Sequence, residues 1–376
     1  LTGDAVVADA VLHDHGVIIV RDPESMMDIA YAASKKVLPS VHSLGVITVS
    51  GGAGIVISDE AERIGLPMPA MPDAAQARLK ALLPYASPVN PLDCTAQALG
   101  APEVLERYDD EGILVFNDPC RATRAIHAIC NAGATLAGDR PAKMPVPDKI
   151  ALPDCAPDEA EAKNILTKAG IACAPETRTK DVEEAVTAAE ALGFPVVMKI
   201  LSPDIIHKSD IGAVKLNIGS AEDVRMAFDE IMQAAKTHVP DAAIGGILVA
   251  KQLSGGVECL MGINRDPTFG PVAVFGLGGI FVELLDDVAL RTCPFDVATA
   301  RDMILSIRGA PILKGARGQE ASDIDALAQM LSKLSIFAAA AGARLLSIDL
   351  NPVLALPQGQ GAYALDAVIE LNEEAS

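Results

Sequence analysis

Residues 193–217, GFPVVMKILSPDIIHKSDIGAVKLN, hold two apolar stretches on either side of a polar segment. The first stretch, FPVVMKIL, is rich in β-branched residues and predicts a strand in which Lys199 is the only charge. An unpaired ammonium group is costly to bury, so Lys199 either leaves the core at the strand end or meets an anion. We interpret Lys199 as a phosphate-binding residue, and a lysine on an exposed strand face is the alternative.

The polar segment holds His207, Lys208 and Asp210 in close succession, before Gly212. A neutral imidazole is a competent nucleophile toward phosphorus near neutral pH, and Lys208 and Lys215 could neutralise a phosphate in transit. The glycine and the preceding proline favour a loop that can move. Residue chemistry alone leaves two interpretations of His207, a phosphoryl carrier or a side chain that fills the loop.

From residue 159 onward, helices and strands alternate. Two segments predict helices that end at glycine, EAKNILTKAGIACAP and DVEEAVTAAEALG. Four later segments predict strands, GILVAKQL, GVECLMGINRD, GPVAVFGLGGIFVELL and LLSIDLNPVLAL. Several of these strands follow one another directly, which indicates an α+β domain over residues 159–376 rather than strict βαβ winding.

The segment GILVAKQLSGGVE predicts a strand that runs into a polar turn. The backbone of Val249, Ala250 and Lys251 could hold an adenine base while Glu258 accepts hydrogen bonds from ribose hydroxyls. This pattern alone is weak, and a strand followed by an ordinary hairpin is the alternative.

Candidate magnesium ligands lie in SIDLNPVLAL, where Asp349 and Asn351 alternate along a strand and so project from one face. Adjacent oxygen ligands suit Mg²⁺, which commonly shares its shell with waters and substrate phosphates. A strand end turned by an Asn-Pro loop is the alternative. In FVELLDDVALR, Glu283 adds a carboxylate and Arg291 a cation, although each alone is most often a solvated surface charge.

The N-terminal part predicts a separate α/β domain over residues 35–137, with an open and mostly parallel sheet. HSLGVITVSGGAGIVISDEAERIGL predicts a strand, a glycine-rich turn and a helix, and EGILVFNDPCRATRAIHAICNAGATLAG predicts a second strand and helix. Gly51, Gly52 and Gly54 leave free backbone N–H groups at a helix start, which favours phosphate binding; a turn that binds nothing is the alternative. The five prolines of residues 138–158 indicate a linker.

The composition excludes several classes of partner. The 376-residue chain is half hydrophobic with a formal net charge of -20, so nucleic acids and anionic membrane surfaces would repel it. The seven cysteines form no CxxC pair and are expected to be reduced. We find no signal peptide and no apolar run long enough to span a bilayer, so we expect a cytoplasmic protein.

Residues 156–370 resemble the ATP-grasp domain of the NDP-forming acyl-CoA synthetases, a superfamily that includes ADP-forming acetyl-CoA synthetase and succinyl-CoA synthetase. The resemblance rests on the opening stretch, GGVECLMGINRDPTFGPVAVFGLGGIFVELLDDVALR, IRGAPILKGARG and IDLNPVLA. Residues 38–137 resemble the flavodoxin-like ligase domain of this family through SGGAG, NPLD and GILVFNDPCRATRAI, and residues 1–34 resemble the end of a preceding CoA-ligase domain. The implied fold is α/β, a flavodoxin-like or Rossmann-like CoA-ligase domain followed by an α+β ATP-grasp domain.

The resemblance implies an acyl-CoA synthetase that converts a carboxylic acid, CoA and ATP into acyl-CoA, ADP and phosphate through acyl phosphate and a phosphohistidine relay, in which a histidine near the CoA site and one on a mobile loop carry the phosphoryl group. It implies that His207 is the carrier histidine, assisted by Lys208, and that the glycine-rich helix start steadies phosphohistidine. The implied ligand sets are Lys199 and Arg291 for the ATP phosphates, residues 249–251 and Glu258 for the nucleoside, and Glu283, Asp349 and Asn351 for Mg²⁺. Asp349 could instead orient His207.

Two features depart from the family pattern. The family's CoA-binding domain, with its first phosphorylated histidine, does not precede Leu1, and NPLD joins GILVF through too few residues for the usual strands and helices. We expect that residues are missing from both places, the second near 100–110. The acid, the choice between ATP and GTP and the size of the expected homo-oligomer stay open. Two alternative functions are an ATP-grasp ligase that uses acyl phosphate without CoA and a nucleotide-binding regulatory module.

Overall fold

Strand β5 (Val196–Leu201) is formed by the first apolar part of the opening stretch, as predicted. Val196, Met198 and Ile200 are fully buried on one face of this strand, while the side chain of Lys199 belongs to the other face. The alternation follows from the two-residue period of a strand. β5 therefore packs its apolar face into a core and presents one lysine on the opposite side.

The computed structural model describes residues 4–39, 41–48, 50–82, 87–93, 114, 116, 118–137, 145–147, 150–202, 204–205, 208, 211–279, 287–318 and 320–372. These residues divide into two compact units, residues 8–142 and residues 143–376 together with residues 1–7. The stretch near 100–110, where we expect missing residues, lies outside the described residues.

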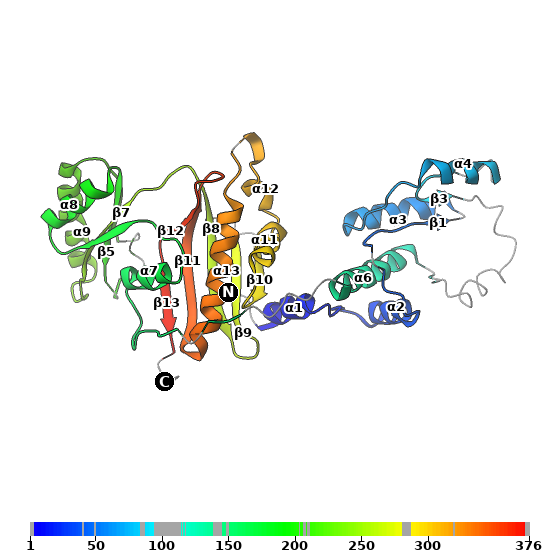
Figure 1. Ribbon diagram of the computed structural model, residues 1–376, viewed down its shortest axis with the longest axis horizontal. Coiled ribbons are helices and arrows are strands. Elements are labelled where there is room, and N and C mark those ends of the chain that lie inside the picture. Colours follow the sequence, from blue (N-terminus) through cyan, green and yellow to red (C-terminus); the bar gives the residue numbers. More distant parts are fainter. Residues whose placement is uncertain are drawn as a thin grey trace. The chain divides into compact units, whose positions relative to one another are not determined.

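β5 belongs to a four-stranded antiparallel sheet in the order β4-β7-β5-β6 (Figure 1). Helices α8 and α9 pack against each other and against this sheet, and together they enclose one hydrophobic core. We call these elements the small-sheet lobe: β4 (Glu176–Thr179), α8 (Val182–Leu192), β5, β6 (Val214–Ile218), α9 (Ala221–His238) and β7 (Gly246–Lys251).

A larger antiparallel sheet has the order β10-β9-β8-β11-β12, and β13 also pairs with β11. Side chains of α7, α11 and α13 join those of the sheet in the largest hydrophobic core. We call these elements the large-sheet lobe: α7 (Glu159–Lys168), β8 (Val257–Asp266), β9 (Gly270–Leu277), β10 (Val288–Thr292), α11 (Val297–Ser306), α12 (Ala310–Leu313), η2 (Ala316–Gly318), α13 (Ile324–Ala341), η3 (Gly342–Arg344), β11 (Leu345–Ala355), β12 (Ala362–Ala364) and β13 (Val368–Leu371).

Helix α13 corrects the expectation that no apolar run is long enough to span a bilayer. Among the described residues, the segment Ile324–Arg344 is long and apolar enough to cross a membrane by length and composition. However, 61% of its apolar window is buried inside the protein, and α13 packs against β8, β9 and β11. A central core helix must be apolar around much of its circumference, so it meets the same criterion.

Residues 8–142 contain three short strands in the described part of the chain, in the order β1-β3-β2. β1 is parallel to β3 and β2 is antiparallel to β3, whereas we expected a mostly parallel sheet. The second predicted helix is present as α6, while its preceding strand near 112–116 lies mostly outside the described residues. Helices α2 and α3 both pack against α6. The elements are α2 (Pro23–Ser34), β1 (Ile47–Thr48), α3 (Gly51–Arg63), α4 (Asp73–Leu82), β2 (Ser87–Pro88), β3 (Leu92–Asp93) and α6 (Pro119–Ala137), and α1 (Asp4–Asp14) contributes residues to both units.

Candidate functional site

Lys199 projects from β5 away from the core of the small-sheet lobe, and 12% of its side chain is exposed. Its Nζ donates to Oε1 of Glu159 at 3.1 Å and to the carbonyl oxygen of Leu365 at 2.9 Å, and it lies 3.5 Å from Oδ2 of Asp366. A lysine that is nearly buried needs such partners. An anion does meet Lys199, and it is a carboxylate of the chain itself.

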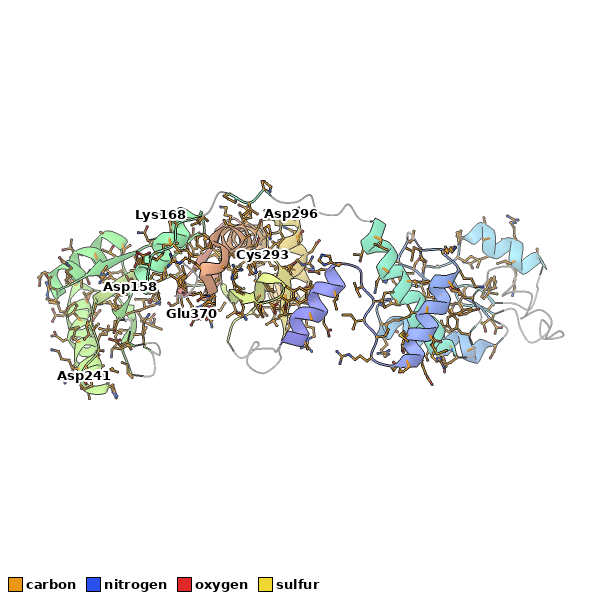
Figure 2. All side chains as sticks on the ribbon, turned by 90° about the horizontal axis from the view of Figure 1, so that it is seen from below. Asp158, Lys168, Asp241, Cys293, Asp296 and Glu370 are labelled. Carbon is orange, nitrogen blue, oxygen red and sulfur yellow. The ribbon has the colours of Figure 1, made fainter. Side chains whose placement is uncertain are left out.

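Glu159 is the first residue of helix α7 in the large-sheet lobe. The helix begins after Asp158, whose Oδ1 accepts a hydrogen bond from the backbone N–H of Glu161 at 3.0 Å. Figure 2 shows Asp158 and Lys168 at the two ends of this helix. Acidic residues in the first turn and a lysine in the last turn complement the helix dipole, so the sequence specifies where the helix begins and ends.

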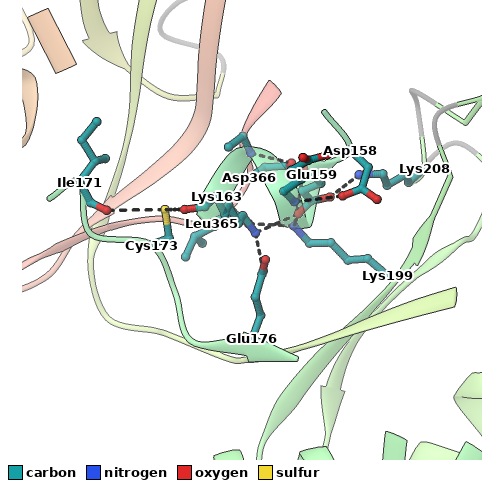
Figure 3. A network of polar contacts seen from close by, with 12 residues as sticks. Asp158, Glu159, Lys163, Ile171, Cys173, Glu176, Lys199, Lys208, Leu365 and Asp366 are labelled. Carbon is teal, nitrogen blue, oxygen red and sulfur yellow. Dashed lines mark hydrogen bonds and ion pairs between the residues drawn. The ribbon is translucent and has the colours of Figure 1, made fainter. Parts of the chain in front are cut away.

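Three ammonium groups converge on the carboxylate of Glu159, whose side chain is 4% exposed (Figure 3). Oε1 accepts from Nζ of Lys163 at 2.9 Å and from Nζ of Lys199, while Oε2 accepts from Nζ of Lys208. We call these four residues the Glu159 cluster. It brings helix α7 together with β5 and the segment after β5, both of which lie later in the sequence.

The cluster is anchored by groups around Lys163. Nζ of Lys163 also donates to Oε2 of Glu176 at 2.6 Å and to the carbonyl oxygen of Leu365 at 2.8 Å. Glu176 comes from β4, and Leu365 lies between β12 and β13, so these bonds join the two lobes. Removing one partner from a buried ion pair leaves an uncompensated charge, which makes such a cluster intolerant of single neutral substitutions.

Electrostatics fix the charge state of the cluster. Burial alone would raise the pKa of Glu159, but the positive charges of Lys199, Lys163 and Lys208 outweigh it and hold the pKa well below its usual range. Burial would lower the pKa of Lys163, yet Glu159 and Glu176 raise it above its usual value. Burial raises the pKa of the Glu176 carboxyl. At neutral pH, Glu159 is therefore an anion surrounded by cations.

Asp349 and Asn351 lie on strand β11, and both are exposed while the intervening Leu350 is fully buried. The predicted alternation of these side chains is confirmed. Although Asp349 is exposed as a residue, partial burial of its carboxyl group, together with the carboxylates of Asp366 and Glu370, raises its pKa. Asp366 is thus electrostatically linked to Asp349 and lies close to Lys199, which brings the predicted metal face toward the Glu159 cluster.

A divalent cation would relieve the repulsion at Asp349, and two oxygen ligands on one strand face fit Mg²⁺ that shares phosphate oxygens. The described residues contain no group of three or more histidine, cysteine, aspartate or glutamate side chains that could hold a metal without other ligands. Asp349 and Asn351 would therefore fill only part of the coordination shell of Mg²⁺, and phosphate oxygens and water would fill the rest.

Sequence comparisons give the family of the chain. A family model described as an ATP-grasp domain matches residues 154–371. The beta subunit of ADP-forming acetate-CoA ligase II from Pyrococcus furiosus is 44% identical over 214 residues, which cover 57% of this chain and 91% of the subunit. The chain belongs to the ADP-forming acyl-CoA synthetases. The resemblance inferred from the sequence motifs is confirmed, as is the α/β architecture with an ATP-grasp domain.

A longer relative covers the whole synthetase chain. ADP-forming acetate-CoA ligase I from Archaeoglobus fulgidus is 31% identical over 442 positions, which cover 100% of this chain and 63% of the ligase. The alignment has more positions than the 376 residues of the chain, so within the matched length the ligase has residues that this sequence does not contain. The synthetase chain thus spans less than two thirds of this single-chain relative.

Solved structures of dinucleotide-forming acetyl-CoA synthetase 1 from Ca. Korarchaeum cryptofilum resemble the synthetase over 58% of its chain and over 94% and 93% of theirs. The TM-scores are 0.56 and 0.51, at 42% and 39% sequence identity. The first is a complex with CoA and Ca-AMPCP. The second is a complex with CoA and Mg-AMPPCP, with its phosphohistidine segment pointing towards the nucleotide-binding site.

In the synthetase, Val249, Ala250 and Lys251 form the end of β7, paired with β4 on one side and β5 on the other. The backbone N–H of Lys251 donates to the carbonyl oxygen of Pro175 at 2.9 Å, and its Nζ donates to the carbonyl oxygen of Gly193 at 2.6 Å. These groups are already hydrogen-bonded within the fold. A nucleoside that contacts this segment must therefore do so at the end of a strand that is paired with β4 and β5.

Glu258 and Arg291 lie on strands that flank β9 in the large-sheet lobe, Glu258 exposed and Arg291 half-buried. The register separates them along the sheet, because Arg291 is opposite Ala273 whereas Cys259, next to Glu258, is opposite Leu277. Their predicted roles at different parts of one nucleotide are consistent with this separation.

Gly51, Gly52 and Gly54 lie in the first turn of α3, which corrects the expectation that they form a turn before the helix. A β-carbon at position 51 would lie 3.0 Å from Oδ2 of Asp93, and one at position 54 would lie 3.3 Å from Cβ of Pro91. Glycine therefore lets the helix start approach the strand β3 closely. The N–H groups of Gly51 and Gly52 precede the first acceptor of the helix, whereas the N–H of Gly54, predicted to be free, donates to the carbonyl oxygen of Ser50 at 3.1 Å.

Two predicted residues, His207 and Glu283, lie outside the described residues, so their roles stay predictions. Lys208, which directly follows His207 in the sequence, is described and belongs to the Glu159 cluster. Lys215 lies in β6 and forms an ion pair with Glu230 of α9. Among the described residues, the side chain of Lys208 thus contacts Glu159, whereas that of Lys215 contacts Glu230.

The sequence analysis missed Glu159, although a signal was present. Glu159, Ala162, Lys163 and Leu166 have the spacing of one helix face, and all four are buried. Two opposite charges on an otherwise apolar face indicate an internal ion pair, because charged residues are almost never fully buried unless paired. The contact with Lys199 has no such signal, because it joins a helix to a strand far along the chain.

Proposed function

We propose that this synthetase converts a carboxylic acid, CoA and ATP into acyl-CoA, ADP and phosphate through phosphohistidine at His207. The imidazole attacks the γ-phosphorus of ATP, the bond to the bridging oxygen breaks, and ADP leaves. The carboxylate then attacks the phosphorus of phosphohistidine, which frees the imidazole and gives an acyl phosphate. Finally, the CoA thiolate attacks the acyl carbon, and phosphate departs.

In this proposal the described residues bind and orient the nucleotide. Lys199, Lys208 and Arg291 would neutralise phosphate oxygens, and Glu258 with the end of β7 would contact the nucleoside. Asp349 and Asn351, together with Glu283, would hold Mg²⁺, which supplies charge neutralisation at the transferring phosphoryl group. On α3, the first N–H groups would steady the phosphorylated histidine.

The observation that supports this function most directly is the convergence of Lys199 and Lys208 on one buried carboxylate. Two ammonium groups that share a carboxylate are also spaced to share a phosphate, since both anions present two oxygens on one central atom. The relatives add the substrate class, because they are named for ADP-forming acetate-CoA ligation and a related structure contains CoA with a magnesium nucleotide.

The test is to incubate the chain with γ-labelled ATP and Mg²⁺ and to measure protein-bound label after acid and alkali treatment. We expect an alkali-stable, acid-labile label that is lost in His207→Ala. The matched control is His238→Ala, which removes an exposed histidine at the end of α9 and should keep the label. ATP turnover without any such label would instead favour a ligase that forms acyl phosphate directly.

We also propose a cytoplasmic location and assembly into a dimer or larger oligomer. The described cysteines are all free thiols, which fits a reducing compartment. A relative is divided into named subunits, which supports assembly from more than one chain. Sedimentation of the purified protein would measure its assembly state, and a monomer at all concentrations would contradict the oligomer.

A further inference from the structure

The Glu159 cluster connects the two lobes of the ATP-grasp unit through one carboxylate. Glu159 begins α7, whose residues Ala162 and Leu166 belong to the core of the large-sheet lobe. Lys199 comes from β5 of the small-sheet lobe, and Lys208 lies between β5 and β6. One side chain of one lobe therefore sets the positions of two cations of the other.

We propose that Glu159 is a positioning residue that places the ammonium group of Lys208 beside that of Lys199, so that the two together bind the oxygens of the phosphoryl group transferred from ATP. The inference rests on the proposed function, since it assigns a role within the same phosphoryl transfer. In this proposal Glu159 contacts neither the nucleotide nor His207, and it acts through Lys199 and Lys208.

The bonds of Lys208 make it the lysine most dependent on Glu159. In the part of the chain that the structure describes, its Nζ contacts the carboxylate of Glu159, while its carbonyl oxygen accepts from the backbone N–H of Ala213 at 2.9 Å. By contrast, Lys199 also donates to the carbonyl oxygen of Leu365, and Lys163 also donates to Glu176. Loss of the charge of Glu159 should therefore release Lys208 first.

Repulsion between the cations explains why a carboxylate is needed. Three ammonium groups within hydrogen-bond reach of one side chain repel one another, and at low exposure water screens them poorly. Glu159 offsets that repulsion and is itself fixed at the start of a helix. An incoming phosphate offers the same two cations an acceptor of the same kind, so the lysines are already spaced for it.

The experiment is rapid-quench measurement of phosphoenzyme formation from γ-labelled ATP, using the full chain and the variants Glu159→Gln, Lys208→Met and the double variant. We expect each single variant to slow phosphorylation by about 10- to 100-fold, the effect of a small misplacement of reacting groups. If Glu159 acts through Lys208, the double variant should be no slower than the slower single variant. Affinity for Mg·ATP, measured by calorimetry, should change less than the rate.

The matched control is Glu176→Gln, which removes a half-buried carboxylate that, among the described residues, hydrogen-bonds Lys163 and forms no ion pair with Lys199 or Lys208. It should lose stability yet phosphorylate at the wild-type rate, which separates positioning from general loss of a buried charge. If Glu159→Gln does not fold, Glu159→Asp keeps the charge but shortens the side chain by one methylene group. That variant should fold and still phosphorylate slowly.

Two outcomes would overturn the inference while leaving the proposed function intact. One is a wild-type rate in Glu159→Gln or Glu159→Asp, and the other is a double variant whose loss equals the product of the two single losses. A wild-type chain that never acquires an acid-labile label would contradict the proposed function itself, and this inference with it.

Discussion

A buried carboxylate at position 159 has an unusual electrostatic environment for a single side chain. Glu159 contacts three lysines, and their charges lower its pKa against the opposing effect of burial. A carboxyl group with a lowered pKa in the folded state stabilises that state at neutral pH. The same group must lose this contribution when acid protonates it.

The first prediction concerns the acid dependence of this contribution. Because the folded-state pKa of Glu159 is below its ordinary value of 4.5, its stabilisation is complete above pH 4.5 and decreases as the pH falls below that value. Glu159→Gln should therefore lower the free energy of unfolding by about 3–5 kcal/mol at pH 7. Urea unfolding at several pH values should show that the difference in free energy of unfolding between wild type and variant becomes smaller below pH 4.5. A difference that stays constant down to pH 3 would contradict the lowered pKa of Glu159.

The second prediction concerns Asp349, whose raised pKa means that its ionised form is disfavoured by the fold. The effect on stability is opposite to that of Glu159. Ionised Asp349 destabilises the folded state above its folded-state pKa, and this destabilisation disappears as the pH falls toward 3.8. Asp349→Asn should raise stability at pH 7 slightly, by no more than about 0.5 kcal/mol. It should also weaken Mg·ADP binding by at least about tenfold in calorimetry. Unchanged Mg·ADP affinity would exclude Asp349 as a metal ligand.

At the scale of elements, the first turns of two helices contribute residues to the proposed site. Helix α7 uses its first residue to hold cations, and α3 uses glycines in its first turn to approach β3. Both lie in the first turn, where backbone N–H groups have no acceptor within the helix. The difference between them is the side chain at the first turn, a carboxylate in α7 and none in α3.

The third prediction tests the start of α3. A β-carbon at Gly52 meets its nearest neighbour, Oγ of Ser50, at 3.8 Å, so a side chain fits there. Gly52→Asp should stabilise the helix by about 0.3–1 kcal/mol, because a carboxylate in the first turn interacts favourably with the helix dipole. It should also repel phosphohistidine and lower the amount of phosphoenzyme at equilibrium with Mg·ATP. Gly52→Asn is the neutral control of the same size, and equal label in both variants would argue against a phosphate at α3.

At the scale of the whole molecule, the chain contains two compact units with separate hydrophobic cores. The proposed nucleotide residues Lys199, Glu258, Arg291, Asp349 and Asn351 all lie in residues 143–376. Units with their own cores respond to ligands separately unless a large interface couples them.

The fourth prediction is that Mg·ADP protects one unit from hydrogen exchange. At 100 times its dissociation constant, a ligand stabilises the state that binds it by about 2.7 kcal/mol. Exchange measured by mass spectrometry on the full chain should slow in peptides from residues 143–376 and remain unchanged in residues 8–142. Equal protection of both units by Mg·ADP would show that nucleotide binding is not confined to the ATP-grasp unit.

Much of the fold was predictable from local pattern. An apolar stretch rich in β-branched residues predicted β5, alternating polar positions predicted β11, and glycine after a helical period predicted the end of α8. The same alternation placed Asp349 and Asn351 on one face. Two predictions were wrong: α13, a core helix, is long and apolar enough to pass for a membrane span, and the glycines before residue 55 lie inside a helix.

The sequence by itself determined that Lys199 either leaves the core or meets an anion, because an unpaired ammonium group is costly to bury. Only the tertiary structure decided that Glu159 supplies that anion, together with Leu365 from a third segment. Periodicity reports which face of an element is buried, but it holds no information about which distant element covers that face. The physical reason is that the partners of a buried charge are chosen by packing in three dimensions, where residues 159, 199 and 365 become neighbours.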